Sequence, residues 1–204
     1  LGKTLQSINL IIKNPKQNTL IICPKNLVNQ WFAEFQKFVS NANIHITLNN
    51  KVEENTSENI IHVHIASHSK LNSKNVKPDD NDFTQFHWDR VIIDEAHIIK
   101  NKSSKLHKSC ENISSDIRWG LTATPVMNKM MDFINILRWI GVPQQLSQNY
   151  TDLVVDTFTI RRTKENVCKN NKHLALPTCH IENVKIPFET KAENDLYIEV
   201  YNEM

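Results

Sequence analysis

Short apolar runs that alternate with amphipathic segments constrain the fold of this chain most strongly. TLIICP at residues 19–24 is a compact apolar run that ends at a proline, and RVIIDEAH at residues 90–97 has the same character. Such runs are typical of strands that are buried on both faces, as in a parallel sheet. Amphipathic helical segments lie between the runs. This alternation predicts an α/β fold with a parallel sheet and helices on both faces.

The other elements are predicted from the same periodicities. Leu5, Ile8, Ile11 and Ile12 recur at helical spacing, so a helix is expected directly after the opening Gly-Lys-Thr. Residues 72–85 contain almost no apolar side chain, which indicates a surface loop or a disordered insertion. Further helices are expected over residues 27–39, 103–113 and 129–140, and further strands over residues 44–48, 60–66 and 117–125.

The pattern changes after about Gly141. We therefore expect one domain over residues 1–141 and a mainly helical extension over residues 142–204. The features expected in the extension are helices within residues 144–172, an exposed strand over residues 179–188, and a final helix whose capping box is formed by Thr190 and Glu193.

Composition narrows the class of protein. A chain of 204 residues with 40% hydrophobic and 23% charged residues fits a globular protein of one large or two small domains. The net charge of +2 lacks the basic excess that nucleic-acid-binding domains commonly show. Four cysteines without a C-x-x-C pair indicate neither a zinc site nor a disulfide framework, and the apolar run at residues 8–12 is too short to cross a membrane. With only three glycines, each is expected where the backbone geometry requires one.

Gly2, Lys3 and Thr4 match the end of a phosphate-binding loop. In G-x-x-x-x-G-K-[ST], backbone amides surround the phosphates, the lysine reaches the β and γ phosphates, and the hydroxyl holds Mg²⁺. The first half of that motif does not precede Gly2 in this sequence. Because unrelated helices also begin with such a tripeptide, it leaves both interpretations open on its own.

Asp94 and Glu95 follow a predicted buried strand. This places two carboxylates at the carboxyl edge of the sheet, where such folds bind ligands. In nucleotide hydrolysis, one carboxylate holds Mg²⁺ and the other accepts a proton from the attacking water. Two solvated acids at a strand end are the alternative. However, Gly-Lys-Thr and Asp-Glu-Ala-His lie in the order and in the helix and strand contexts that a nucleotide-hydrolysing core requires.

GLTATP at residues 120–125 ends another predicted strand with small residues and hydroxyl groups. Thr122 and Thr124 are therefore candidates to lie beside the metal and to transmit the state of the metal site to a neighbouring lobe. A plain turn that ends at Pro125 is the alternative interpretation.

The order GKT, DEAH and TAT resembles the superfamily-two nucleic-acid motors, and the neighbouring residues narrow the resemblance to the Swi/Snf-type (Snf-two) ATPase family. LIICPKNLVNQWFAEFQKF resembles the strand, proline and tryptophan-bearing helix of that family, and IASHSKL is similar to another of its segments. DEAHIIKNKSSK, GLTATPVMN and TIRRTKENV resemble three further family motifs. The resemblance covers nearly the whole chain.

The resemblance implies a RecA-like, P-loop ATP-binding lobe of a DNA-dependent ATPase. Such an enzyme couples ATP hydrolysis to translocation on double-stranded DNA and remodels protein–DNA complexes, including chromatin. The resemblance also implies the site residues. Gly2, Lys3 and Thr4 would bind ATP, and Thr4 and Asp94 would hold Mg²⁺. Glu95 would act as general base, with Asp94 and Lys3 beside it in catalysis, and coupling to DNA would involve His97, Thr122 and Thr124.

The resemblance also implies a surface for double-stranded DNA. Because such motors mainly contact phosphates, they need hydrogen-bond donors and local positive charge. Lys25, Ser67 and Lys70 match the segments that follow the DNA backbone, although each is equally compatible with a solvated loop. His68 stands where the family usually has tyrosine, so no DNA contact is assigned to it.

A second motor lobe is implied as well, because in this family its arginines complete the ATP site. Arg161 and Arg162 match the segment that leads out of the first lobe, where an interlobe or structural role and a DNA contact both remain open. We expect these 204 residues alone to hydrolyse ATP poorly. The expected location is the nucleus, or a host nucleus if the gene is viral. Nucleosomes or transcription proteins are candidate partners, and no membrane association is expected.

Two alternatives to a duplex translocase remain open. The first is a strand-separating helicase or the motor of a restriction system, since these proteins share GKT, DEAH and TAT. The second is a degenerate lobe that binds DNA or protein without catalysis.

Overall fold

The computed structural model describes residues 2–39, 43–48, 60–71, 83–149, 151–163, 166, 180–182, 184 and 186–203. The chain divides into two compact units, Leu1–Thr159 and Ile160–Met204, and each is described by itself. The first unit continues past Gly141 and includes α6 (Gln144–Asn149) and α7 (Thr151–Phe158).

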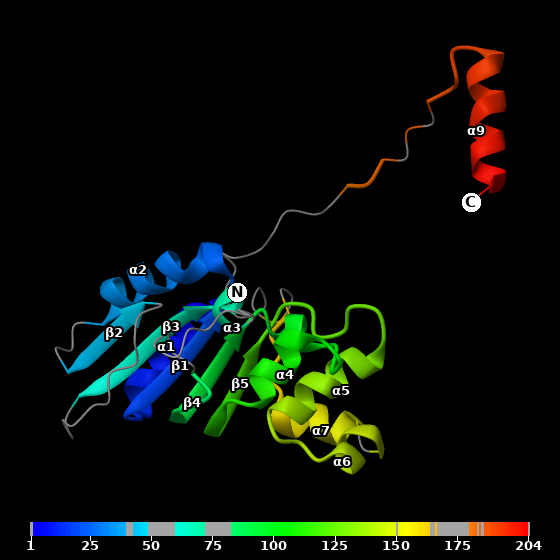
Figure 1. Ribbon diagram of the computed structural model, residues 1–204. Coiled ribbons are helices and arrows are strands. Elements are labelled where there is room, and N and C mark those ends of the chain that lie inside the picture. Colours follow the sequence, from blue (N-terminus) through cyan, green and yellow to red (C-terminus); the bar gives the residue numbers. More distant parts are fainter. Residues whose placement is uncertain are drawn as a thin grey trace. The chain divides into compact units, whose positions relative to one another are not determined.

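The first unit is built on a five-stranded sheet in the order β2-β3-β1-β4-β5 (Figure 1). Every pair of neighbouring strands is parallel, as the sequence predicts. Five parallel strands bring all their carboxyl ends to one edge of the sheet. The strands are β1 (Asn18–Cys23), β2 (Ile44–Leu48), β3 (Ile61–Ser67), β4 (His87–Asp94) and β5 (Ser114–Leu121).

Helices cover both faces of this sheet, which confirms the predicted α/β class (Figure 1). Successive residues of a strand point to opposite faces, so on β1 Ile21 contributes to one core while Leu20 and Ile22 contribute to the other. Full burial of such a side chain is worth about 1.5–3 kcal/mol. The first core lies under α1 (Lys3–Lys13) and α2 (Val28–Phe38), and the second under the 3-10 helix η2 (Ala96–Ile99), α4 (Lys105–Glu111) and α5 (Met130–Trp139).

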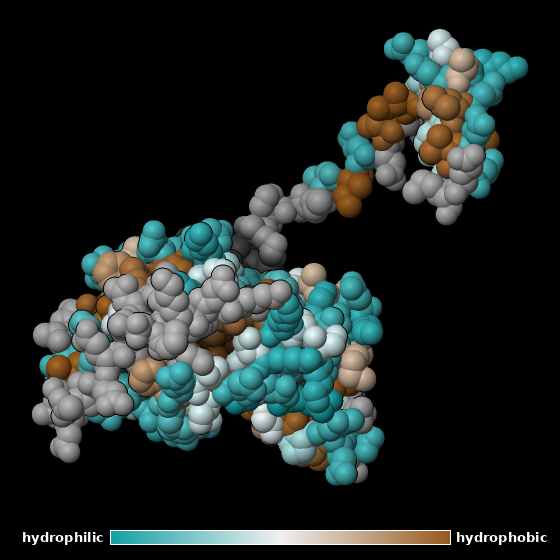
Figure 2. Space-filling view, viewed as in Figure 1, coloured by the Kyte–Doolittle hydropathy of each residue, from teal (hydrophilic) through white to brown (hydrophobic). Residues whose placement is uncertain are grey.

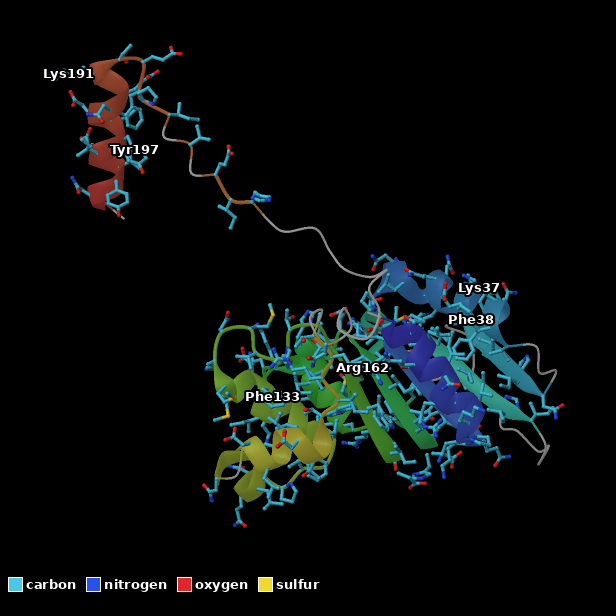
Figure 3. All side chains as sticks on the ribbon, turned by 180° about the vertical axis from the view of Figure 1, so that it is seen from behind. Lys37, Phe38, Phe133, Arg162, Lys191 and Tyr197 are labelled. Carbon is cyan, nitrogen blue, oxygen red and sulfur yellow. The ribbon has the colours of Figure 1, made fainter. Side chains whose placement is uncertain are left out.

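A smaller apolar cluster joins α5 to the helices that follow it. Phe133 and Leu137 on α5 are buried with Val142 and with Val154 on α7 (Figure 3). The predicted helices of residues 144–172 are thus present as α6 and α7, and the later part of that segment lies largely outside the described residues.

The strand predicted over residues 117–125 is wrong at both ends. β5 begins at Ser114 and ends at Leu121. Directly after it, the hydroxyl of Thr122 accepts a hydrogen bond from the backbone N–H of Thr124 at 3.1 Å. Such a local bond offers the backbone an alternative to the strand ladder. The threonines therefore lie in a loop beyond the sheet.

The predicted surface loop at residues 72–85 also needs correction at its end. Phe83 is buried in the second core, and its carbonyl oxygen accepts a hydrogen bond from the indole of Trp88 at 2.9 Å. Phe83 therefore belongs to the core and not to a surface loop. Residues 72–82 lie outside the described residues.

The second unit contains α9 (Lys191–Glu203), and the predicted capping box at its start is present. The backbone N–H of Glu193 donates to Thr190 Oγ1 at 3.3 Å, and that of Thr190 donates to Glu193 Oε2 at 3.4 Å. Tyr197 stacks on Tyr201 along the helix (Figure 3). Apolar side chains lie exposed on this unit (Figure 2): Phe188, Leu196, Tyr197, Ile198, Val200 and Tyr201.

The strand predicted over residues 179–188 is not formed by the described residues of that segment. A strand is stabilised by hydrogen bonds to a neighbouring strand, and alternation of side chains alone does not supply one. None of the helices in the described part of the chain is both long and apolar enough to span a bilayer.

Candidate active site

The predicted phosphate-binding and acidic residues meet at the carboxyl edge of the sheet. Lys3, in the first turn of α1, places its Nζ 2.8 Å from Glu95 Oε1 and 3.9 Å from Asp94 Oδ1. The lysine and Asp94 come from segments about ninety residues apart in the sequence. The side chains of Lys3 and Glu95 are 30% and 29% exposed, so a ligand can reach both.

The backbone of Glu95 adopts an unusual conformation. Its φ of 52° and ψ of 50° lie in the left-handed region, and it is the single non-glycine residue with positive φ among those the structure describes. This conformation costs an L-residue about 1–2 kcal/mol. It directs the chain from β4 into η2, and the Glu95 N–H donates to Asp94 Oδ1 at 3.0 Å. Such strain often accompanies a functional site.

His97 connects the acidic pair to the loop after β5. Its Nδ1 lies 3.2 Å from Glu95 Oε2 and 3.3 Å from Thr122 Oγ1. Since a carboxylate only accepts hydrogen bonds, Nδ1 carries the proton when it bonds to Glu95. Lys3, Asp94, Glu95, His97 and Thr122 are called the carboxyl-edge cluster below.

Gly2 and Thr4 flank Lys3 at the start of α1. Gly2 occupies the position before the helix with φ of 73°, a left-handed conformation that glycine adopts without steric penalty. Thr4 follows in the first helical turn and is half-buried. Backbone N–H groups of a first turn lack partners within their helix and attract anions. The helix therefore presents both its N–H groups and Lys3 at this edge.

Two residues that contact Asp94 were not among the predicted site residues. The indole Nε1 of Trp31, on α2, donates to Asp94 Oδ2 at 3.0 Å, and Nε2 of His68 lies 3.1 Å from the Asp94 carbonyl oxygen. The sequence signal for Trp31 is its place on the apolar face of a helix, because a buried indole N–H usually finds an acceptor. His68 gave no comparable signal.

Cys23, at the carboxyl end of β1, is buried near the same acids. Burial, reinforced by the charge of Asp94, raises the pKa of its thiol to about 12. The thiol therefore stays protonated and acts as a small apolar group. Cys110 is also buried, and both cysteines are free thiols.

The predicted DNA-contacting residues lie at this edge but outside the carboxyl-edge cluster. Lys25 follows β1 and Lys70 lies on α3 (His68–Leu71), and both are exposed. Ser67, the last residue of β3, is buried, and its Oγ lies 2.9 Å from Ser69 Oγ. Thr124 contributes its backbone N–H to the turn at Thr122. Arg161 and Arg162 belong to the second unit.

The oxygen donors at this edge suit a hard cation. Mg²⁺ is usually bound through one or two carboxylates, with waters and substrate phosphates as further ligands. Asp94 supplies a carboxylate, and the contact with Lys3 places it beside the turn that carries Thr4. Within the described ranges, no group of three or more histidine, cysteine, aspartate or glutamate side chains could hold a metal by itself.

Comparison with known proteins gives a family match over residues 1–152, to the family described as the SNF2-related domain. One similar protein is the DNA repair protein RAD5 of Gibberella zeae, which is 28% identical over 99% of this chain and 20% of the relative. Another is a probable global transactivator of Orgyia pseudotsugata multicapsid polyhedrosis virus, 28% identical over 100% of this chain and 42% of the relative.

Solved structures of the Sulfolobus solfataricus SWI2/SNF2 ATPase core share the fold and confirm its RecA-like class. The core in complex with double-stranded DNA matches 76% of this chain with a TM-score of 0.56 and 25% identity. The core domain alone matches 86% of this chain with a TM-score of 0.60 and 23% identity. This chain covers 32% and 39% of those two chains, so it spans well under half the length of the proteins that it resembles.

Proposed function

This chain belongs to the SNF2-related domain family, and we propose that it is the ATP-binding lobe of a DNA-dependent ATPase. In the full-length protein, ATP hydrolysis drives movement along double-stranded DNA and the remodelling of protein–DNA complexes. The observation that carries this proposal is the contact of Lys3 with Glu95 at 2.8 Å, with Asp94 beside them. It joins a phosphate-binding helix start to two carboxylates, which are the groups that hydrolysis requires.

In this mechanism, Lys3 exchanges Glu95 for the β and γ phosphates of ATP. The exchange is feasible because both side chains are partly exposed and an ion pair of this kind is weak in contact with water. Glu95 then accepts a proton from a water molecule that attacks the γ-phosphorus. The bond from phosphorus to the β–γ bridging oxygen breaks, and ADP and phosphate are formed.

Thr4 and Asp94 hold Mg²⁺ in this proposal, since their hydroxyl and carboxylate oxygens fit its preference for hard donors. When bound, the ion neutralises charge that develops on the phosphate oxygens. Gly2 allows the backbone N–H groups of the first turn of α1 to face the phosphates.

His97 connects a change in the contacts of Glu95 to the loop after β5. When Lys3 leaves Glu95, the contacts of His97 with Glu95 and Thr122 redistribute. Through Thr122 the change reaches Thr124, whose backbone N–H bonds to the same hydroxyl. These residues therefore couple the nucleotide state to the rest of the motor.

Double-stranded DNA is the proposed nucleic-acid partner, and a nuclear site of action is proposed with it. Support comes from the solved ATPase core in complex with double-stranded DNA and from relatives whose names denote DNA repair or transcription termination. Lys25 and Lys70 are proposed to contact DNA phosphates, because both are exposed and follow strands at the same edge as the carboxyl-edge cluster. Ser67 ends β3 beside them and is buried, so a contact of its hydroxyl with DNA requires that the segment after β3 moves.

The test is ATP turnover by the full-length protein, with and without duplex DNA, for the wild type and for Lys3→Ala. We expect DNA to stimulate turnover by the wild type, and Lys3→Ala to abolish that stimulated turnover. Lys13→Ala is the matched control, since Lys13 lies in the last turn of the same helix. Equal rates for the wild type and Lys3→Ala would overturn the proposal.

A further inference from the structure

Asp94 is held at both its carboxylate and its backbone carbonyl by residues outside the carboxyl-edge cluster. Trp31 bonds to Oδ2 of the carboxylate, and His68 bonds to the carbonyl oxygen. Trp31 lies on α2, which follows β1, and His68 begins α3, which follows β3. Two separate elements therefore converge on one residue, Asp94, which ends a third element, β4.

The bond from Trp31 lies in a dry environment. Trp31 is 1% exposed and Asp94 is 5% exposed. A hydrogen bond to an ionised carboxylate is stronger than one between neutral groups, and burial strengthens it further. The second carboxylate oxygen, Oδ1, accepts the N–H of Glu95. Each oxygen thus has one protein donor that fixes its direction and retains lone-pair capacity for a cation.

The bond from His68 fixes the backbone in the same way. The carbonyl oxygen can only accept, so Nε2 of His68 carries the proton. The bond ties the first residue of α3 to the last residue of β4.

We propose that Trp31 and His68 are positioning residues that hold Asp94 in the orientation in which it binds Mg²⁺. This inference rests on the proposed function, since it takes Asp94 as the metal ligand. An unrestrained aspartate has to be ordered each time the cation binds. Hydrogen-bond partners behind a ligand remove that cost, and their loss typically weakens metal affinity by about 10–100-fold.

The chain offers a matched control for Trp31. Trp139 is likewise buried, at 2% exposure, and its Nε1 donates to the carbonyl oxygen of Cys110 at 3.1 Å in the second core. Trp31→Phe and Trp139→Phe therefore each remove one indole N–H and one ring from a buried position. They differ in whether the lost bond ends on Asp94.

The first experiment measures how the stabilisation of the full-length protein by ADP depends on Mg²⁺. The quantity is the Mg²⁺ concentration that gives half of the maximal rise in the thermal unfolding temperature. A ligand that binds the folded state raises this temperature by mass action. We expect Trp31→Phe to increase the half-maximal Mg²⁺ concentration about tenfold or more, and Trp139→Phe to leave it unchanged. Equal values for the two variants would overturn the role of Trp31 while leaving the proposed function intact. A wild type with no Mg²⁺-dependent stabilisation by ADP would overturn the proposed function and this inference together.

The second experiment tests His68 with the same titration. His68→Leu removes the N–H donor, whereas His68→Gln retains a side-chain N–H that can reach the Asp94 carbonyl oxygen. We expect His68→Leu to raise the half-maximal Mg²⁺ concentration, and His68→Gln to restore it at least partly. Wild-type behaviour of His68→Leu would overturn the role of His68. A merely structural role would change the unfolding temperature of both variants without changing their Mg²⁺ dependence.

Discussion

The two edges of the sheet both carry charged side chains, but these side chains have different partners. At the carboxyl edge, Lys3 and His97 contact the Glu95 carboxylate, so charged side chains pair mainly with one another. Toward the amino ends of the strands, Arg90 donates to the backbone carbonyl of Asn14 at 2.7 Å. There the partners are mostly backbone groups.

Two further charged residues also bond to the backbone. Asp89 accepts the N–H of Asn18 at 2.7 Å. Arg118, in the middle of β5, donates to the carbonyl oxygens of Ile113 at 2.8 Å and Trp139 at 3.1 Å. Asp89, Arg90 and Arg118 are called the backbone-bonded group below.

Exposed side chains also pair toward the amino ends, since His87 Nε2 lies 2.9 Å from Asp116 Oδ1. The carboxyl edge differs because its paired charges adjoin the start of α1, whose N–H groups attract anions. A ligand can therefore recruit the charges at the carboxyl edge, whereas charges bonded to the backbone stabilise the fold.

The largest expected effect is on turnover, from Glu95→Gln at the carboxyl edge. Loss of a general base typically lowers a rate by about 10²–10⁴-fold. The free energy of unfolding should change by less than about 1 kcal/mol, because the ion pair is partly exposed. Steady-state phosphate release by the full-length protein and urea denaturation measure the two quantities.

Asp116→Asn is the matched control for Glu95→Gln. Asp116 also contacts a histidine, since its Oδ1 lies 2.9 Å from Nε2 of His87, but it lies at the amino ends of the strands. We expect its turnover to equal that of the wild type. A similar loss of turnover in both variants would contradict the distinction between the two edges.

The next effect is on stability, from Arg118→Met in the backbone-bonded group. This change leaves two backbone carbonyls without their charged donor, and hydrogen bonds to charged groups are worth about 1.5–3 kcal/mol each. We expect the free energy of unfolding to fall by about 2–4 kcal/mol, less than the sum of two such bonds because Arg118 is only half-buried and water can replace part of the loss. Urea denaturation measures the change. Turnover per folded molecule at low temperature should stay unchanged. A stable variant with impaired turnover would place Arg118 with the functional residues instead.

The third expected effect is a pH dependence of the free energy of unfolding. It arises in the interior of the sheet, at His64, and not at either edge. Burial, with smaller contributions from His62 and His45, lowers the pKa of His64 to about 4. In the unfolded chain its pKa is about 6.5, so protons bind the unfolded state more readily over this interval. Stability from the neutral ring is therefore complete above pH 6.5 and declines as the pH falls toward 4. Linkage gives a loss of about 2 kcal/mol between pH 7.5 and pH 5.

His64→Gln tests this assignment, because glutamine does not titrate. We expect the free energy of unfolding of the variant to vary less between pH 7.5 and pH 5 than that of the wild type. The same pH dependence in both proteins would show that His64 does not control acid stability.

Much of the fold and of the site could be predicted because both depend on local patterns. The run VIID predicts a buried strand, and a parallel sheet brings the ends of its strands to one edge. This pattern places Glu95 at the carboxyl edge, and the resemblance to the Swi/Snf-type family implied that Lys3 lies beside it, as the structure shows. The expectation that glycines mark special geometry also holds at Gly120, where an added Cβ would lie 3.2 Å from Cβ of Ala96. The catalytic and DNA-binding roles of these residues stay predictions.

The remaining features depend on packing between elements, which periodicity does not encode. The apolar face of α2 predicts that Trp31 is buried, but the choice of Asp94 as its acceptor depends on how α2 lies on the sheet. Similarly, Phe83 is buried in the second core although it follows a polar stretch of sequence. The early end of β5 follows from the hydroxyl of Thr122, because a short local hydrogen bond competes with the strand ladder.

The smallest expected effect comes from Ser104→Ala, which tests whether position at the carboxyl edge is enough to give a role in turnover. Ser104 caps the start of α4, soon after η2, and its Oγ accepts the N–H of His107 at 3.1 Å. Loss of such a cap costs about 1 kcal/mol, to be measured by urea denaturation. Ser103→Ala is the control, since its hydroxyl donates to Asn101 Oδ1 and, among the described residues, accepts no N–H of α4, so its loss should matter less. We expect turnover to stay at the wild-type level in both variants, because neither serine contacts the carboxyl-edge cluster. A clear loss of turnover in Ser104→Ala would mean that the orientation of α4, and not only the paired charges, determines activity at this edge.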